Sequence, residues 1–267
     1  MDVERSAPLV VWIALAAAIV CAFSLSALAQ QSHPTINFTV SCPTKEMAPL
    51  LGSACTIFAA GEIDLDAGKR LEAFLEANHV PAWSHIYLDS PGGNPVGAMQ
   101  MGRVIRKHRM NTDIGAFDSA NRVRPARCFS ACAFAFLGGE YRYRVNGSRY
   151  GIHQFAFSSP DPRDVETAQL LAAAEMDYIR EMAVDPSLWS LEAGVSPNAM
   201  YEPSEEKLVA LGVLNYGRSP VKWSIESTDL GVYLKGEQAT AFGINKFIIA
   251  CQDNRFALDW IFFIETA

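Results

Sequence analysis

The chain has 267 residues, 50% of them hydrophobic, and carries a formal net charge of −7 with a pI near 5.3. This length and composition are those of an ordinary globular protein that can bury one sizeable core and a small appendage. The acidic balance, with no basic stripe for phosphates, argues against a nucleic-acid partner.

The N-terminal segment has the pattern of an export signal. Arg5 precedes an apolar run, and the Ala-Leu-Ala at 27–29 supplies the small residues after which signal peptidase cleaves. We therefore expect the mature chain to begin at Gln30 and to be periplasmic or secreted. Residues 8–29 are also just long enough to span a bilayer, so the alternative is a retained single-pass anchor that associates the N-terminus with a membrane.

The cysteines suggest disulfide bonds. Of the six, Cys21 lies in the export segment and five remain, in a protein expected to meet an oxidising compartment. Cys42 with Cys55 would close a loop before the first strand, and Cys128 with Cys132 would brace a turn, although cysteine can also serve there as a small packing residue. Five is odd, so one thiol is expected to stay free. No Cys/His spacing resembles a zinc site, and we expect no metal and no cofactor.

Hydrophobic periodicity predicts alternating strands and helices along the first two thirds of the mature chain. Strands are expected over residues 56–63, 85–88 and 112–117, and helices over residues 66–78, 95–108 and 130–137. Two more strands, 141–145 and 150–157, are joined by Asn146-Gly147, which is typical of a tight hairpin turn. This order is that of a layered α/β protein rather than of a helix bundle or a β-sandwich.

Two helices, over residues 164–182 and 204–211, precede a β-rich C-terminal region. The first carries four acids, which we interpret as a solvated face opposite an apolar seam: Glu166, Glu175, Asp177 and Glu181. The expected organisation is a signal peptide or anchor over residues 1–29, an α/β domain over residues 30–216, and a small β appendage over residues 217–267.

Ser130 and His153 have the clearest catalytic pattern. Ser130 lies where a loop enters an apolar helix, so unpaired N–H groups and the positive end of the helix dipole face it. His153, central in its predicted strand, would take the Ser130 proton and return it to the leaving group. The N–H groups of Ala131 and of Gly93, which ends a Ser-Pro-Gly-Gly turn, would bind the oxyanion. Taken alone, a serine at a helix start is usually only a cap, so the joint pattern carries this assignment.

The order of these motifs resembles the ClpP/crotonase superfamily, and most closely the exported relatives of the Clp protease proteolytic subunit. The resemblance covers roughly residues 57–215. It rests on IYLDSPGG at 86–93, the Ser-Ala turn into an apolar helix, GIHQ at 151–154 and EEKLVALGVLN at 205–215.

The resemblance implies a specific site and assembly. It makes Ser130 the nucleophile, His153 the base, and Gly93 with Ala131 the oxyanion donors. It also implies a core of repeated ββα units and a homo-oligomer with contacts through the helix at 164–182.

One departure from the family concerns the residue that orients the histidine. The family has an aspartate just before the 205–215 segment, whereas residues 196–201 contain no acid. Asn198 could hold the imidazole of His153 by an amide hydrogen bond, but it would not stabilise the imidazolium as a carboxylate does. Asp161 and Asp185 are the other candidates.

These observations favour an exported ClpP-like serine hydrolase, a peptidase that cleaves short or unfolded peptides through an acyl-enzyme without metal or nucleotide. The missing aspartate favours an alternative, a weak or inactive envelope protein of the same fold with a binding or assembly role. A crotonase-type acyl-thioester enzyme is a third hypothesis, which is disfavoured because enolate chemistry does not need a Ser/His pair.

Overall fold

The computed structural model describes residues 34–263, except residues 121, 158–160, 162–163, 230, 242 and 253–254. The signal peptide or anchor predicted for residues 1–29 lies outside the described residues. Within the described part of the chain, no helix is both long and apolar enough to cross a membrane.

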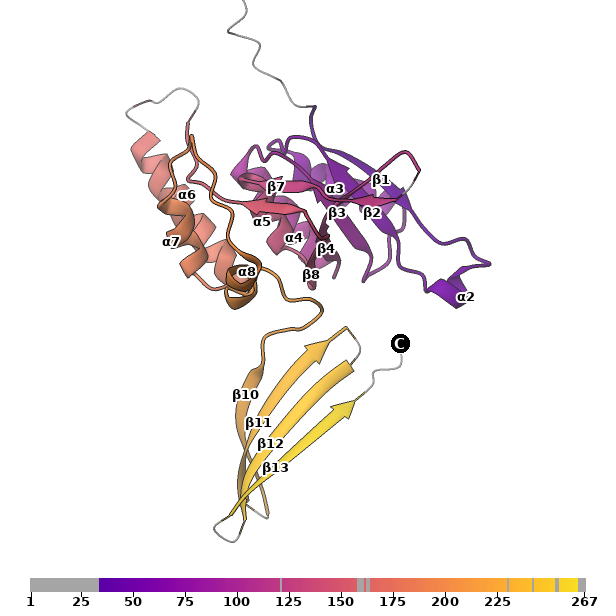
Figure 1. The fold of residues 1–267 in the computed structure, drawn as a ribbon, viewed down its shortest axis with the longest axis vertical. Coiled ribbons are helices and arrows are strands. Elements are labelled where there is room, and N and C mark those ends of the chain that lie inside the picture. Colours follow the sequence, from indigo (N-terminus) through magenta and orange to yellow (C-terminus); the bar gives the residue numbers. More distant parts are fainter. Residues whose placement is uncertain are drawn as a thin grey trace, which may run out of the picture. The chain divides into compact units, whose positions relative to one another are not determined.

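A five-stranded sheet of order β1-β2-β3-β4-β8 is the centre of the α/β part (Figure 1). β1 (Asn37–Ser41) is antiparallel to β2 (Thr56–Ala60). From β2 onward the pairing is parallel, through β3 (His85–Asp89), β4 (Asn111–Ile114) and β8 (Arg142–Arg144). Parallel pairing requires crossover connections, and helices α3 and α4 supply two of them. The predicted mixed α/β class is confirmed.

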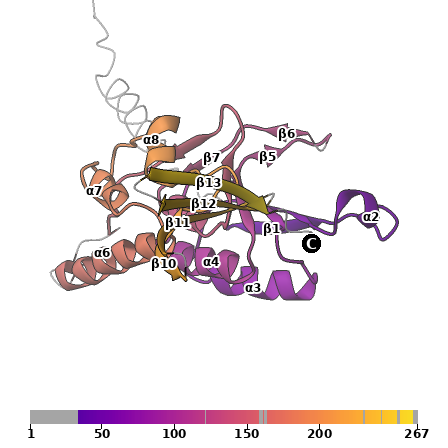
Figure 2. The same ribbon diagram turned by 90° about the horizontal axis from the view of Figure 1, so that it is seen from below.

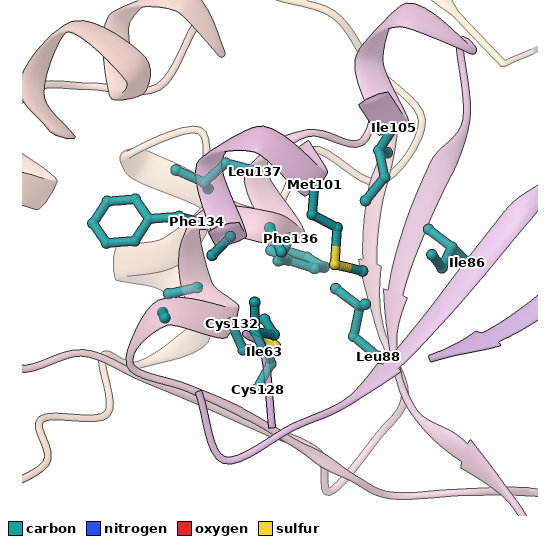
Figure 3. Close-up of a cluster of buried hydrophobic side chains, with 14 of the residues drawn as sticks. Ile63, Ile86, Leu88, Met101, Ile105, Cys128, Cys132, Phe134, Phe136 and Leu137 are labelled. Atoms are coloured by element: carbon teal, nitrogen blue, oxygen red, sulfur yellow. A yellow bond between two sulfur atoms is a disulfide. The ribbon is translucent and has the colours of Figure 1, made fainter. Parts of the chain in front are cut away.

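Three of the helices contribute many of the core side chains beside this sheet. α3 (Ala67–Ala77) and α4 (Pro95–Lys107) pack side by side (Figure 2). The Asn94 side chain caps α4 by accepting a hydrogen bond from the Gly97 N–H at 2.9 Å. α5 (Ala131–Leu137) is buried at every residue, which explains its wholly apolar sequence. Figure 3 shows side chains of α4, α5 and β3 packed into one hydrophobic cluster.

Two disulfide bonds are present among the described residues, and both match the predicted pairs. Cys42 bonds to Cys55, and Cys128 bonds to Cys132. The second pair lies beside Ile63 within the buried cluster (Figure 3). It therefore ties the strand before Ser130 to the helix after it.

Replacing both Cys42 and Cys55 with serine is expected to lower the free energy of unfolding by about 3 kcal/mol. The reason is that the bond joins residues 13 positions apart and so closes a loop in the unfolded chain. Urea unfolding of the parent and the double variant measures the difference. Equal midpoints would show that this bond does not form in the purified protein.

The predicted hairpin around Asn146-Gly147 is wrong in its pairing. The turn itself forms, since Ser148 N–H donates to the Val145 carbonyl at 2.9 Å and Gly147 has φ +83°. However, β8 pairs with β4, while β9 (Arg149–Gly151) pairs in parallel with β7 (Arg127–Phe129). Tertiary partners override the local turn. The strand predicted for residues 150–157 ends at Gly151, so His153 lies after a strand and not within it.

The remaining helices and strands differ from the predicted ones mainly in where they begin and end. The strand expected over residues 112–117 is divided at Gly115, and β5 (Ala116–Phe117) pairs with β6 (Val123–Arg124). The predicted helices α6 (Asp164–Glu181) and α8 (Glu205–Ala210) are present. Two short helices were not predicted, α2 (Ala48–Leu51) and α7 (Ser187–Ala193).

The C-terminal residues form a four-stranded antiparallel sheet in sequence order. Its strands are β10 (Lys222–Thr228), β11 (Gly231–Thr240), β12 (Gly243–Gln252) and β13 (Arg255–Phe263). The β-rich character predicted for this region is therefore observed. That it forms a separate appendage stays a prediction.

Candidate active site

Three adjacent parallel segments bring the predicted catalytic residues to one edge. Ser90, which follows β3, forms a parallel bridge with Cys128 of β7, and Cys128 pairs in turn with Tyr150 of β9. The chain leaves these segments toward Gly93, Ser130 and His153 respectively. Because parallel segments end at the same edge, residues from three distant parts of the sequence meet there.

Ser130 occupies a strained turn between β7 and α5. Its φ of 55° and ψ of −128° are the values of a type II′ turn, which usually requires glycine. Its N–H donates to the Gly151 carbonyl at 2.9 Å, and the Cys128–Cys132 bond spans the turn. Strain of this kind costs on the order of 1–3 kcal/mol and is concentrated at functional sites. The side chain makes no capping hydrogen bond, so Ser130 is not simply an N-cap.

The glycine turn lies against Ser130. A Cβ on Gly92 would come within 2.8 Å of the Ser130 Cβ, so only glycine fits there. Backbone hydrogen bonds to Ile63 fix the neighbouring Gly93 on both sides. The Ile63 carbonyl accepts from the Asn94 N–H at 2.7 Å, and the Ile63 N–H donates to the Gly92 carbonyl at 2.7 Å. In such a parallel bridge the Gly93 N–H points away from Ile63.

Two backbone donors are unused at this point. Neither the Gly93 N–H nor the Ala131 N–H donates to a protein acceptor in the described part of the chain. The Ala131 N–H is free because the first turn of a helix has no internal acceptors. Both residues line the cavity that Ser130 also lines, so the two N–H groups are available to an oxyanion.

His153 is half-buried on the same cavity. Burial lowers the pKa of its imidazole below the ordinary value, and the carbonyls of Pro197 and Gln154 offset this in part. Nδ1 is buried and makes no hydrogen bond of good geometry with any described residue. The imidazole is therefore neutral near pH 7, as a general base must be, but no carboxylate of a described residue orients it.

The segment over residues 195–201 lies beside His153. Ile152 and Tyr201 exchange backbone hydrogen bonds of 2.9 and 3.0 Å, and Gln154 N–H donates to the Val195 carbonyl at 3.0 Å. This pairing brings Asn198 to the cavity wall. Its side chain is exposed and makes no hydrogen bond to His153.

The two alternative acids do not join the site. Asp185 accepts a hydrogen bond from the Ser187 N–H at 2.8 Å at the start of α7. Asp161 is tied to the start of α6, where its N–H donates to the Asp164 carboxylate. Neither aspartate lines the cavity.

The cavity beside Ser130 has a volume of about 730 Å³ and mostly apolar walls. They come from the glycine turn, α4, α5, α6 and the segment after β9, and include Val96, Phe134, Phe155, Phe157, Leu170, Leu171 and Ala174. No lysine or arginine is among its described lining residues. Within the described part of the chain, no three His, Cys, Asp or Glu side chains cluster closely enough to hold a metal ion.

Two buried glutamates also line this cavity, and sequence analysis missed both. Glu175 of α6 was assigned to a solvated face, but it is only 1% exposed. The signal was its spacing, since Leu171, Tyr178 and Ile179 lie on the same helical face. Glu192 lies on α7, a helix that the sequence did not predict, and is 6% exposed.

Burial raises the pKa of both carboxyl groups. The pKa of Glu175 rises to about 7, although a hydrogen bond from Trp189 offsets part of the effect. The pKa of Glu192 rises to about 9 through burial and the nearby Glu175. Neither forms an ion pair with a described residue, and Glu175 Oε1 has no hydrogen-bond partner among them. Near neutral pH, Glu192 is therefore mainly protonated, while Glu175 lies close to the midpoint of its titration.

Comparison with known proteins gives structural likenesses but no match by sequence. No family model matches the chain, and no curated protein matches it by sequence. Among solved structures, the chain is similar to a mutant of ClpP1 from Listeria monocytogenes, at 17% identity and a TM-score of 0.46. The alignment covers 60% of this chain and 88% of that chain.

Proposed function

We propose that the protein is a serine hydrolase of the ClpP type that cleaves peptide bonds. His153 Nε2 takes the proton of the Ser130 hydroxyl while Oγ bonds to the substrate carbonyl carbon. The resulting oxyanion accepts hydrogen bonds from the Gly93 and Ala131 N–H groups. The imidazolium then gives its proton to the amine, the C–N bond breaks, and water releases the acyl group from Ser130 by the reverse sequence.

The observation that carries this proposal is the convergence of four groups on one cavity. A serine in a strained II′ turn, a neutral histidine and two unused backbone N–H groups all line it. A structural role for Ser130 would not require this backbone conformation. Nor would it leave two backbone N–H groups of the cavity wall without an acceptor among the described residues.

Since no described carboxylate contacts His153, we expect catalysis to be slow. Without one, the imidazolium formed during attack gains only the weaker stabilisation of backbone carbonyls. This observation also favours the second candidate, an envelope protein that retains the fold for binding or assembly. Export to the periplasm or outside, and assembly into a homo-oligomer, remain parts of the proposal that the sequence supports.

The test is hydrolysis of a mixture of unstructured peptides by the purified protein, analysed by mass spectrometry, with Ser130→Ala as the matched control. Cleavage by the parent and none by the variant supports the proposal. An acyl-thioester assay runs in parallel. Thioester turnover that survives in the Ser130→Ala variant would instead favour crotonase-type chemistry, which uses the two N–H groups without the serine.

A further inference from the structure

The buried acids Glu175 and Glu192 have no part in the mechanism proposed above. They come from two different helices, α6 and α7, and both line the cavity that Ser130 lines. No cationic side chain among the described residues pairs with either. Uncompensated buried carboxyl groups are destabilising, so their placement in a substrate cavity calls for a ligand.

An independent observation also points to a ligand. Glu175 is only 1% exposed, and its Oε1 is one of three buried side-chain polar atoms without a partner in the described part of the chain. Buried polar atoms in folded proteins are almost always hydrogen-bonded. Since Glu175 lines the cavity, a donor that enters the cavity would lie beside this side chain.

We infer that the cavity is a specificity pocket for a cationic side chain of the substrate, arginine or lysine, at the residue whose carbonyl Ser130 attacks. The inference rests on the proposed function, which fixes where the scissile bond lies. The guanidinium or ammonium group binds Glu175 and Glu192. The apolar walls, including Phe134 and Leu171, take the methylene stem. Arginine fits best, because its planar group donates to two carboxylates at once.

Binding of a cation should depend on pH. Entry of the cation favours the ionised carboxylates, so binding releases the protons that Glu175 and Glu192 carry without a ligand. The pKa of Glu175 is then about 7 and that of Glu192 about 9. Among the described residues, Tyr150 interacts electrostatically with Glu192, and His153 lines the same cavity. Burial raises the pKa of the Tyr150 phenol, so the phenol stays neutral. Burial lowers the pKa of His153, so its imidazole is neutral at pH 7 and above. Affinity for a cation should therefore rise from pH 6 to pH 8.

The binding test uses n-butylguanidinium as the probe and n-pentanamide as its neutral counterpart, with calorimetry on the full-length Ser130→Ala protein. We expect the guanidinium to bind at least about tenfold more tightly at pH 8, and its affinity to fall at pH 6. Equal affinities, or affinity for the guanidinium that does not change with pH, would overturn the inference. This measurement needs no catalysis and no substitution of either acid.

The kinetic test compares peptides with arginine, lysine, leucine or glutamine before the scissile bond. We expect kcat/KM for arginine to exceed that for leucine at least tenfold, and Glu175→Gln to lower this ratio at least tenfold. Glutamine mimics the protonated acid, so the fold should tolerate it. The control is Glu166→Gln, an exposed acid of the same helix, which should leave the ratio unchanged. A leucine preference in the parent would overturn the inference.

The two proposals fail in different ways. If a fluorophosphonate labels Ser130 but n-butylguanidinium binds no better than the amide, the cationic pocket is wrong and the hydrolase stands. If the guanidinium binds and the serine is never acylated or labelled, the hydrolase is wrong and the cavity is a binding site for cationic groups.

Discussion

Replacing His153 with alanine is expected to lower kcat/KM for peptide hydrolysis by about 10³-fold, within the range that a positioned general base contributes. The physical reason is that His153 is the only imidazole among the described residues that line the cavity beside Ser130, and that Glu192, with a pKa of about 9, keeps its proton near neutral pH. Steady-state kinetics of the parent and the variant measure the effect. A loss of less than about tenfold would show that His153 is not the base.

The pH profile of the parent gives a second readout of the same residue. Burial lowers the pKa of His153, and only the neutral imidazole accepts the Ser130 proton. For a substrate with leucine before the scissile bond, kcat/KM should therefore rise with pH along a limb whose midpoint lies below pH 6.5, and should be level above it. Glu175→Gln should keep this limb. A midpoint above pH 6.5 would indicate a carboxylate partner that stabilises the imidazolium.

Replacing Gly93 with alanine should damage both stability and catalysis. A Cβ at this position would lie 2.1 Å from the Ile63 carbonyl oxygen, and the φ of +132° is strained for any L side chain. The turn must shift and carry the Gly93 N–H with it. We expect a loss of about 10²–10³-fold in kcat, as for other oxyanion donors, and destabilisation on the order of 1–3 kcal/mol.

The matched control for this substitution is Gly231→Ala. Gly231 has a similar φ of +138°, but a Cβ there would meet nothing within 4 Å. The Gly231→Ala variant should therefore be destabilised by backbone strain alone, as measured by thermal unfolding, and its kcat should be unchanged. Full activity in the Gly93→Ala variant would remove Gly93 from the oxyanion hole.

Local chemistry in the sequence was enough to predict which of these residues come together. A glycine pair after a buried strand and a serine before a wholly apolar helix are local signals, and the structure brings Gly93, Ser130 and Ala131 to one cavity. The same holds for Cys128 and Cys132, whose short spacing around the turn made the disulfide predictable.

The strand pairing and the buried acids depended on tertiary structure and could not be predicted from local sequence. Asn146-Gly147 predicted a hairpin because the turn is local, but the partners of β8 and β9 are strands far away in the sequence. Glu175 was misassigned because an isolated acid in a helix is usually solvated, whereas α7 covers it. Glu192 could not be foreseen, since α7 has only seven residues and little periodicity to reveal it.

The most direct measurement is the reaction of the purified protein with an alkyl fluorophosphonate, followed by intact mass and peptide mapping. We predict a single adduct on Ser130, no adduct in the Ser130→Ala variant, and greatly slowed labelling in the His153→Ala variant, with all three proteins folded by circular dichroism. A folded parent that is not labelled, or a label that persists in the Ser130→Ala variant, would contradict the assignment of Ser130 as an activated nucleophile.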